Sequence, residues 1–286
     1  MIRATCTRRG TCNESHPEEG SVDITVDIRE TGIPEGVIGL VQRLPQPETL
    51  KGSGITITLR FWDIFVFTTG LVLLATWRKA LPDGVEVVID DSACQETTRR
   101  LLTNSGFREI IETGAEGPST VYRFPGRIPI QPIVRGYSTE QAISDISRIL
   151  DEFAGQVVDS SPFRVMLSEL CENTFAHSEF ETTGYMCARL NPANNICEIA
   201  VADSGIGIPN SYLEGTNEDA KQRIANGASP IDLAIDALNS SKHTPVPGTV
   251  TSHYGYGLFI VRRLVEENRG RLTIISDDEC VSIERY

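Results

Sequence analysis

The sequence feature that most constrains the fold is an apolar run that ends in an Asp-Gly turn. Residues 196–202 combine alternation with branched side chains, which predicts a β-strand. The strand leads into Asp203, with Gly205 and Gly207 just beyond it. Glycines let the backbone approach a flat or charged ligand, and the carboxylate can accept a hydrogen bond from an amino group. An ordinary turn at the end of a strand gives the same letters, so this stretch alone leaves both interpretations open.

A polar stripe lies on a helix predicted from about residue 162 to 177. Glu169, Asn173 and His177 are spaced four residues apart, so they share one face of that helix. Most such stripes are solvated polar faces. However, Asn is unfavourable inside a helix, and its cost is explained if its carboxamide oxygen binds a cation such as Mg²⁺.

A third segment places glycines at the start of a helix. Gly255 and Gly257 precede Leu258, which opens an apolar helix predicted over 258–268. Backbone amides at a helix N-terminus preceded by glycines bind phosphate oxygens. A single GxG at a helix start is weak evidence by itself.

Together, the Glu/Asn helix, the Asp203 turn and the GxG helix start resemble the ATP site of the GHKL superfamily. That superfamily includes type II topoisomerase ATPase subunits, Hsp90 chaperones, sensor histidine kinases, anti-sigma-factor serine kinases and MutL proteins. The motifs occur in the family's order, and the resemblance covers about 138–286. It implies an α/β fold class (an α+β sandwich) with a C-terminal Bergerat-type ATP-binding domain, in which helices pack on a mixed sheet.

The resemblance also implies roles for single residues. Glu169 would be the catalytic acid/base residue, Asn173 the Mg²⁺ ligand, and Asp203 the acceptor of the adenine amino group. His177 would contact phosphate or merely stabilise the end of its helix. Lys242 is a candidate phosphate contact, although lone loop lysines are usually solvated. The expected nucleotide-contacting residues are Asn173, His177, Asp203, Gly205, Gly207, Ile208, Lys242, Gly255, Gly257 and Leu258.

The segment between the second and third motifs is expected to cover the nucleotide. Residues 209–254 contain a helix-like stretch at 230–238 and a loop rich in Pro, Gly, Ser and His, which suits a lid. Family members usually finish with a further strand pair carrying a base-holding Thr. Here the last predicted strands are 271–276 and 280–284, so either the sheet closes early or the chain is incomplete.

The first half of the chain predicts a smaller α/β unit after a polar tail at 1–20. Strands at 22–28, 55–59 and 85–89, with helices between and after them, indicate a small open sheet backed by helices. The stretch from Asp63 to Leu71 resembles the loop of STAS-like domains of anti-anti-sigma factors, where a hydroxyl residue can be phosphorylated. At Thr68 or Thr69 the hydroxyl can equally be a helix N-cap.

The expected domains are therefore a tail (1–20), a STAS-like domain (21–130) and an ATP-binding domain (131–286). The apolar run 64–77 is shorter than the roughly 20 residues of a membrane-spanning helix. A net charge of −13 argues against nucleic acid or an anionic membrane as the main partner. Seven irregularly spaced cysteines disfavour a zinc site, and reduced thiols without a signal-peptide pattern fit the cytoplasm.

The function expected from these features is that of a Mg-ATP-binding signalling protein, namely an ATP-dependent serine/threonine kinase of the anti-sigma type. Two alternatives stay open: an ATP-driven conformational switch nearer the Hsp90 and MutL branch, and a non-catalytic nucleotide-sensing module. ATP and Mg²⁺ are the expected cofactors. A STAS-domain or other regulatory protein is the expected partner, and a homodimer stays open.

Overall fold

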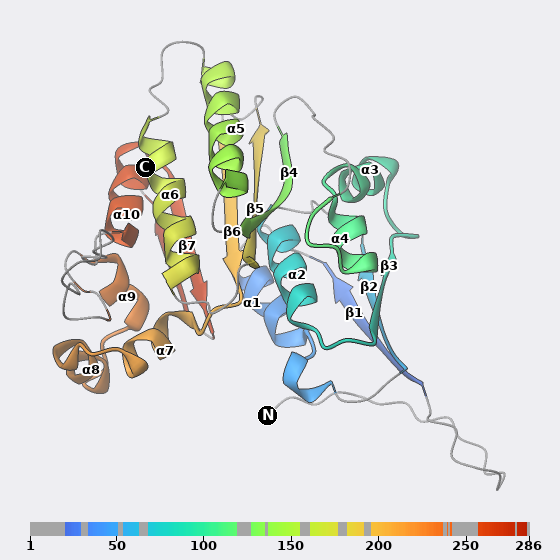
Figure 1. Ribbon diagram of the computed structural model, residues 1–286, viewed down its shortest axis with the longest axis horizontal. Coiled ribbons are helices and arrows are strands. Elements are labelled where there is room, and N and C mark those ends of the chain that lie inside the picture. Colours follow the sequence, from blue (N-terminus) through green and yellow to red (C-terminus); the bar gives the residue numbers. More distant parts are fainter. Residues whose placement is uncertain are drawn as a thin grey trace, which may run out of the picture.

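Figure 1 shows the computed structural model of the chain. The structure describes residues 21–29, 34–50, 54–62, 68–118, 127–134, 137–154, 161–176, 182–191, 196–236, 239, 241, 257–277 and 279–284. The expected tail at 1–20 and Asp63 therefore lie outside the described residues.

The first unit contains a parallel sheet, called here the N-terminal sheet. Its strands are β1 (Val22–Ile28), β2 (Ile55–Phe61) and β3 (Val85–Asp90), in the order β1-β2-β3. The three predicted strands are confirmed, with β2 and β3 slightly longer than expected. Along β2 every second residue is buried, which is the burial pattern of a strand with one face on a core.

Helices connect these strands and follow them. They are α1 (Pro34–Arg43), a 3-10 turn at Pro47–Thr49, α2 (Thr68–Ala80), α3 (Glu96–Asn104) and α4 (Phe107–Thr113). The predicted helix at 97–103 is confirmed as α3. Helix α4 was not predicted, because it is short and follows α3 after a left-handed Gly106 with φ of 77°.

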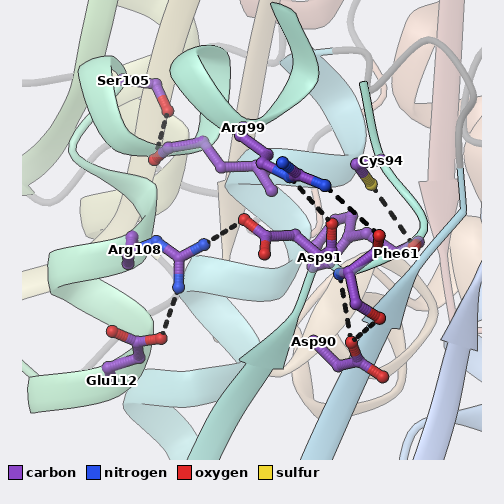
Figure 2. A network of polar contacts seen from close by, with 10 residues as sticks. Phe61, Asp90, Asp91, Cys94, Arg99, Ser105, Arg108 and Glu112 are labelled. Atoms are coloured by element: carbon purple, nitrogen blue, oxygen red, sulfur yellow. Dashed lines mark hydrogen bonds and ion pairs between the residues drawn. The ribbon is translucent and has the colours of Figure 1, made fainter. Parts of the chain in front are cut away.

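A polar network fixes α3 and α4 to the end of β3 (Figure 2). Arg108 of α4 forms ion pairs with Asp91 and with Glu112, the latter at 2.8 Å. Arg99 of α3 donates to the carbonyl oxygens of Asp91 and Ser92, each at 3.3 Å. These contacts are structural, since each joins a helix to the loop after β3 or to its own next turn.

The second half contains an antiparallel sheet, called here the central sheet. Its order is β4 (Arg127–Val134), β5 (Thr182–Asn191) and β6 (Ile196–Asp203). Strand β6 is the predicted strand, whereas β4 and β5 were not predicted. Two prolines in β4 argue against a strand by sequence, but β4 is an edge strand with register shifts and tolerates them.

Helices cover both faces of the central sheet. Helices α5 (Tyr137–Ala154) and α6 (Ser161–Ala176) pack on one face, where Met186 of β5 is buried with their core residues. Helix α2 packs on the other face, and Cys187 and Ala200 belong to the same buried core as the N-terminal sheet. Neighbouring residues of β5 thus point into different cores, as the pleat of a strand requires.

The remaining elements are three short helices, a longer helix and a hairpin. They are α7 (Gly207–Glu214), α8 (Glu218–Ala225), α9 (Pro230–Ile235), α10 (Gly257–Glu267), β7 (Arg271–Ser276) and β8 (Glu279–Glu284). Strands β7 and β8 pair antiparallel as a separate two-stranded sheet. The described strands of the second half therefore form two antiparallel sheets, where one mixed sheet was expected.

The segment expected to form a lid is helical and anchored where the structure describes it. Helix α7 contacts β7, and α9 contacts α10 and β8. The carbonyl oxygen of Ser241 accepts hydrogen bonds from the backbone amides of Thr216 at 2.9 Å and Asn217 at 3.2 Å. None of the described helices combines the length and apolar character needed to cross a membrane.

Candidate functional site

The candidate site begins on α6, which presents Glu169 and Asn173. Leu167 and Cys171 on the same helix are buried against the central sheet, which fixes the rotation of α6 about its axis. Burial, with a smaller contribution from neighbouring Glu172, raises the pKa of the Cys171 thiol to about 12. Glu169 and Asn173 are half-buried and lie one turn apart, as their spacing predicted.

Gly257, the first residue of α10, lies directly against these two side chains. A Cβ built on Gly257 would lie 2.8 Å from Glu169 Oε2, and 3.4 Å and 3.5 Å from Asn173 Nδ2 and Oδ1. A side chain at 257 would therefore have to displace the polar groups of Glu169 and Asn173. The first backbone amides of a helix have no intrahelical partner, so they are available to an anion.

The side chain of Asn173 has unmet hydrogen-bonding capacity. Among the described residues, its Nδ2 is a buried polar atom without a hydrogen-bond partner. The oxygen and nitrogen of a carboxamide are interchangeable by a flip, so the same position can present Oδ1. A buried amide oxygen beside a carboxylate and a helix N-terminus fits a hard cation shared with phosphate oxygens. The residues present are thus compatible with Mg²⁺.

Asp203 is exposed at the end of β6. Its Oδ1 accepts a hydrogen bond from the backbone amide of Gly205 at 2.8 Å, which makes an Asx turn. The turn orients the carboxylate and leads the chain into α7. Opposite Asp203 on β5 lies Gly184.

The glycine turn is docked on the end of β7. Gly207 has a φ of +77°, a conformation that side chains other than glycine rarely adopt. The next amide, that of Ile208, donates to Ser276 Oγ at 2.9 Å. Ser276 was not singled out from the sequence. The sequence offered one signal for it: Ser276 is a hydroxyl residue at the end of the predicted strand 271–276, just as Asp203 is a polar residue at the end of β6.

The described contacts gather the expected residues into two groups. Glu169, Asn173 and Gly257 form one group, and the turn from Asp203 to Ile208 forms the other. The groups are connected by α6 packing on β6, and by α7 and α10 both packing on β7. In Figure 1, α10 lies beside α6, and β6 leads into α7 within the same half of the molecule. Leu258 is half-buried in the first turn of α10, next to Gly257.

Three expected site residues, namely His177, Lys242 and Gly255, lie outside the described residues. Their assignment stays a prediction.

A comparison with protein families bears on this arrangement. Residues 158–284 match the family model described as "Histidine kinase-, DNA gyrase B-, and HSP90-like ATPase". The chain contains a GHKL-type ATPase domain. The matched residues run from just before α6 to β8, so this domain includes both groups of the candidate site. An ATPase domain of this kind implies ATP binding.

The ATPase domain does not account for the whole central sheet. Strand β4 and helix α5 precede the matched residues, yet β4 is hydrogen-bonded to β5. Comparisons with curated proteins and with solved structures gave no match.

Proposed function

We propose that the protein is a Mg-ATP-dependent serine/threonine kinase that acts in signalling. The observation that supports this best is the convergence of the Glu169 carboxylate and the Asn173 carboxamide on Gly257. A carboxylate, a cation ligand and the backbone amides at a helix start are groups that suit phosphoryl transfer from ATP, because that reaction depends mainly on positioning and neutralisation of charge.

Each group has a distinct role in this proposal. Glu169 accepts the proton of the attacking hydroxyl as its oxygen forms a bond to the γ-phosphorus, and the bond to the β–γ bridging oxygen breaks. The amides at the start of α10 bind phosphate oxygens. Asn173 holds Mg²⁺, which when bound neutralises charge on the phosphates. Asp203 accepts a hydrogen bond from the adenine amino group, while Gly205, Gly207 and Ile208 lie against the base.

The acceptor is proposed to be a hydroxyl on a partner protein, such as a STAS-domain regulator. The STAS-like pattern of the first unit motivates this choice. Within the chain, Thr68 is a poor acceptor in this conformation, because it is 5% exposed and its hydroxyl donates to Glu198 Oε1.

A second candidate function is an ATP-driven conformational switch, in which Glu169 activates water. The observation that favours it is the packing of α2 from the first unit on the central sheet. A conformational change on nucleotide binding or hydrolysis would then reach the first unit through α2, without transfer of a phosphoryl group to a protein.

The experiment incubates purified protein with γ-labelled ATP and Mg²⁺, alone and with casein as a generic hydroxyl acceptor. Wild type is compared with Glu169→Gln, Asn173→Ala and the control Glu140→Gln, which changes an exposed glutamate of α5. Label on serine or threonine supports the kinase, and free phosphate alone supports the switch. Binding without turnover contradicts both and favours a nucleotide-sensing module. Asn173→Ala should remove the Mg²⁺-dependent gain in affinity; an unchanged gain would contradict its role.

A further inference from the structure

Helix α2 of the first unit lies along β6, the strand that ends in Asp203. At one end of the contact, the backbone amide of Thr68 donates to Glu198 Oε1 at 3.0 Å, and its hydroxyl donates to the same oxygen. At the other end, Thr76 Oγ1 donates to the carbonyl oxygen of Ala202 at 3.3 Å. Both threonines are 5% exposed, so these are buried contacts between two units.

The spacing of the two contacts shows that helix and strand run side by side in the same direction. From Thr68 to Thr76 an α-helix rises about 12 Å. From Glu198 to Ala202 a strand rises about 13 Å. The two rises agree, so one straight helix can contact the strand at both points.

The carbonyl of Ala202 is constrained from a second side by β5. A Cβ on Gly184 would lie 2.0 Å from that oxygen and 2.8 Å from the Cα of Asp203. Glycine at 184 therefore permits the carbonyl of Ala202 to lie against β5. Thr76 and Gly184 come from different units and meet at one peptide group.

That peptide group carries Asp203. The carbonyl of Ala202 and the amide of Asp203 lie in one plane, because the peptide bond does not rotate freely. Fixing the carbonyl therefore fixes the direction in which the chain enters Asp203, and the Gly205 amide fixes its carboxylate from the other side.

We propose that Thr76 is a positioning residue for Asp203, through which the first unit sets the preference of the ATPase domain for adenine. This inference rests on the proposed adenine contact of Asp203. Thr76 does not touch the nucleotide; it holds the peptide group from which the recognising carboxylate extends.

The test uses the full chain and compares ATP with inosine triphosphate, which lacks the 6-amino group. The variants are Thr76→Val, which keeps the shape and removes the donor, Thr76→Ala as a smaller variant without the donor, and Thr76→Ser, which retains it. Ser147→Ala is the matched control, because Ser147 of α5 is 2% exposed and donates to the carbonyl of Ile143 in its own helix instead of to β6. Kd values are measured by calorimetry, with melting temperatures alongside.

The preference for ATP over inosine triphosphate should fall about 3- to 10-fold in Thr76→Val and Thr76→Ala, which corresponds to one hydrogen bond. Thr76→Ser should retain the preference for ATP. Ser147→Ala should lower the stability of the protein without changing that preference. An unchanged preference in both Thr76 variants, while Asp203→Asn abolishes it, overturns the inference and leaves the proposed adenine contact standing. Absence of the preference in wild type overturns that contact and this inference together.

Discussion

At the scale of single residues, the site depends on a position where a methyl group would displace the side chains of the site. Gly257 separates the start of α10 from the carboxylate of Glu169 and the carboxamide of Asn173. Glycine at this position thus leaves room for both side chains, in addition to its proposed role in phosphate binding. The sequence suggested the second role through the helix start, but the first depends on α6.

Gly257→Ala should weaken Mg-ATP binding about tenfold, because the added Cβ would lie 2.8 Å from Glu169 Oε2 and would push this carboxylate out of its position in the site. Equilibrium binding with a fluorescent ATP analogue measures the change. Gly39→Ala in α1 is the control, since its Cβ would meet Arg43, a residue outside the candidate site, at 3.2 Å. Equal affinities in both variants would show that the close approach is irrelevant to binding.

The buried thiol of Cys171 predicts a pH dependence of stability. Its folded pKa is raised from 9.0 to about 12. Between these values the unfolded chain releases a proton that the folded chain retains. The stability present below pH 9 should therefore fall as pH rises, by at most about 1.4 kcal/mol per pH unit for this group.

Urea unfolding of wild type and Cys171→Ala at several pH values between about 8 and 11 isolates this contribution. Other buried groups titrate equally in both proteins, so the free energy of unfolding should fall less steeply with pH in the variant than in wild type. Identical slopes would mean that Cys171 ionises equally in the folded and unfolded states.

At the scale of elements, β5 shows how one strand serves two cores. Tyr185 and Cys187 belong to the core shared with α2, while Met186 and Ala188 face α5 and α6. A strand buried on both faces has no apolar/polar alternation, which is why β5 could not be recognised from the sequence.

Gly184→Ala should destabilise the protein by about 3 kcal/mol, because its Cβ would lie 2.0 Å from the carbonyl oxygen of Ala202 and the end of β6 would have to move. Chemical denaturation gives the value, and Gly39→Ala again serves as the control for adding a methyl group. A loss below about 1 kcal/mol would indicate that the two strands separate easily at this point.

At the scale of the whole molecule, α2 belongs to a buried core that joins the two units. Its residue Leu74 is 0% exposed and belongs to a core that includes Ile57 of the N-terminal sheet and Cys187 of the central sheet. The unit boundary along the chain, expected near residue 130, is therefore crossed by a continuous core.

Leu74→Ala should lower the free energy of unfolding by about 2–5 kcal/mol, the usual cost of removing a large buried side chain. Because the core is shared, hydrogen exchange should accelerate in both β2 and β5. Leu213→Ala, at a side chain 60% exposed, should leave both strands unchanged. Faster exchange confined to β2 would show that the units unfold independently.

The sequence by itself determined the elements with a clear period and the three motifs of the site. Local apolar patterns located β1, β2, β3 and β6, and the helix period placed Glu169 and Asn173 on one face. Period is a local property, so a single segment reveals it. The glycines also stand out locally, because turns and helix starts select them.

The tertiary structure alone decided which faces meet. It placed α2 on the central sheet and brought Thr76 to the peptide group before Asp203. It also placed Ser276, at the end of β7, against the turn that follows β6. These relations join segments far apart in the chain, where burial selects partners by shape and composition. The sequence of an apolar face does not specify which other face it will pack against, because the pairing depends on how the whole core packs.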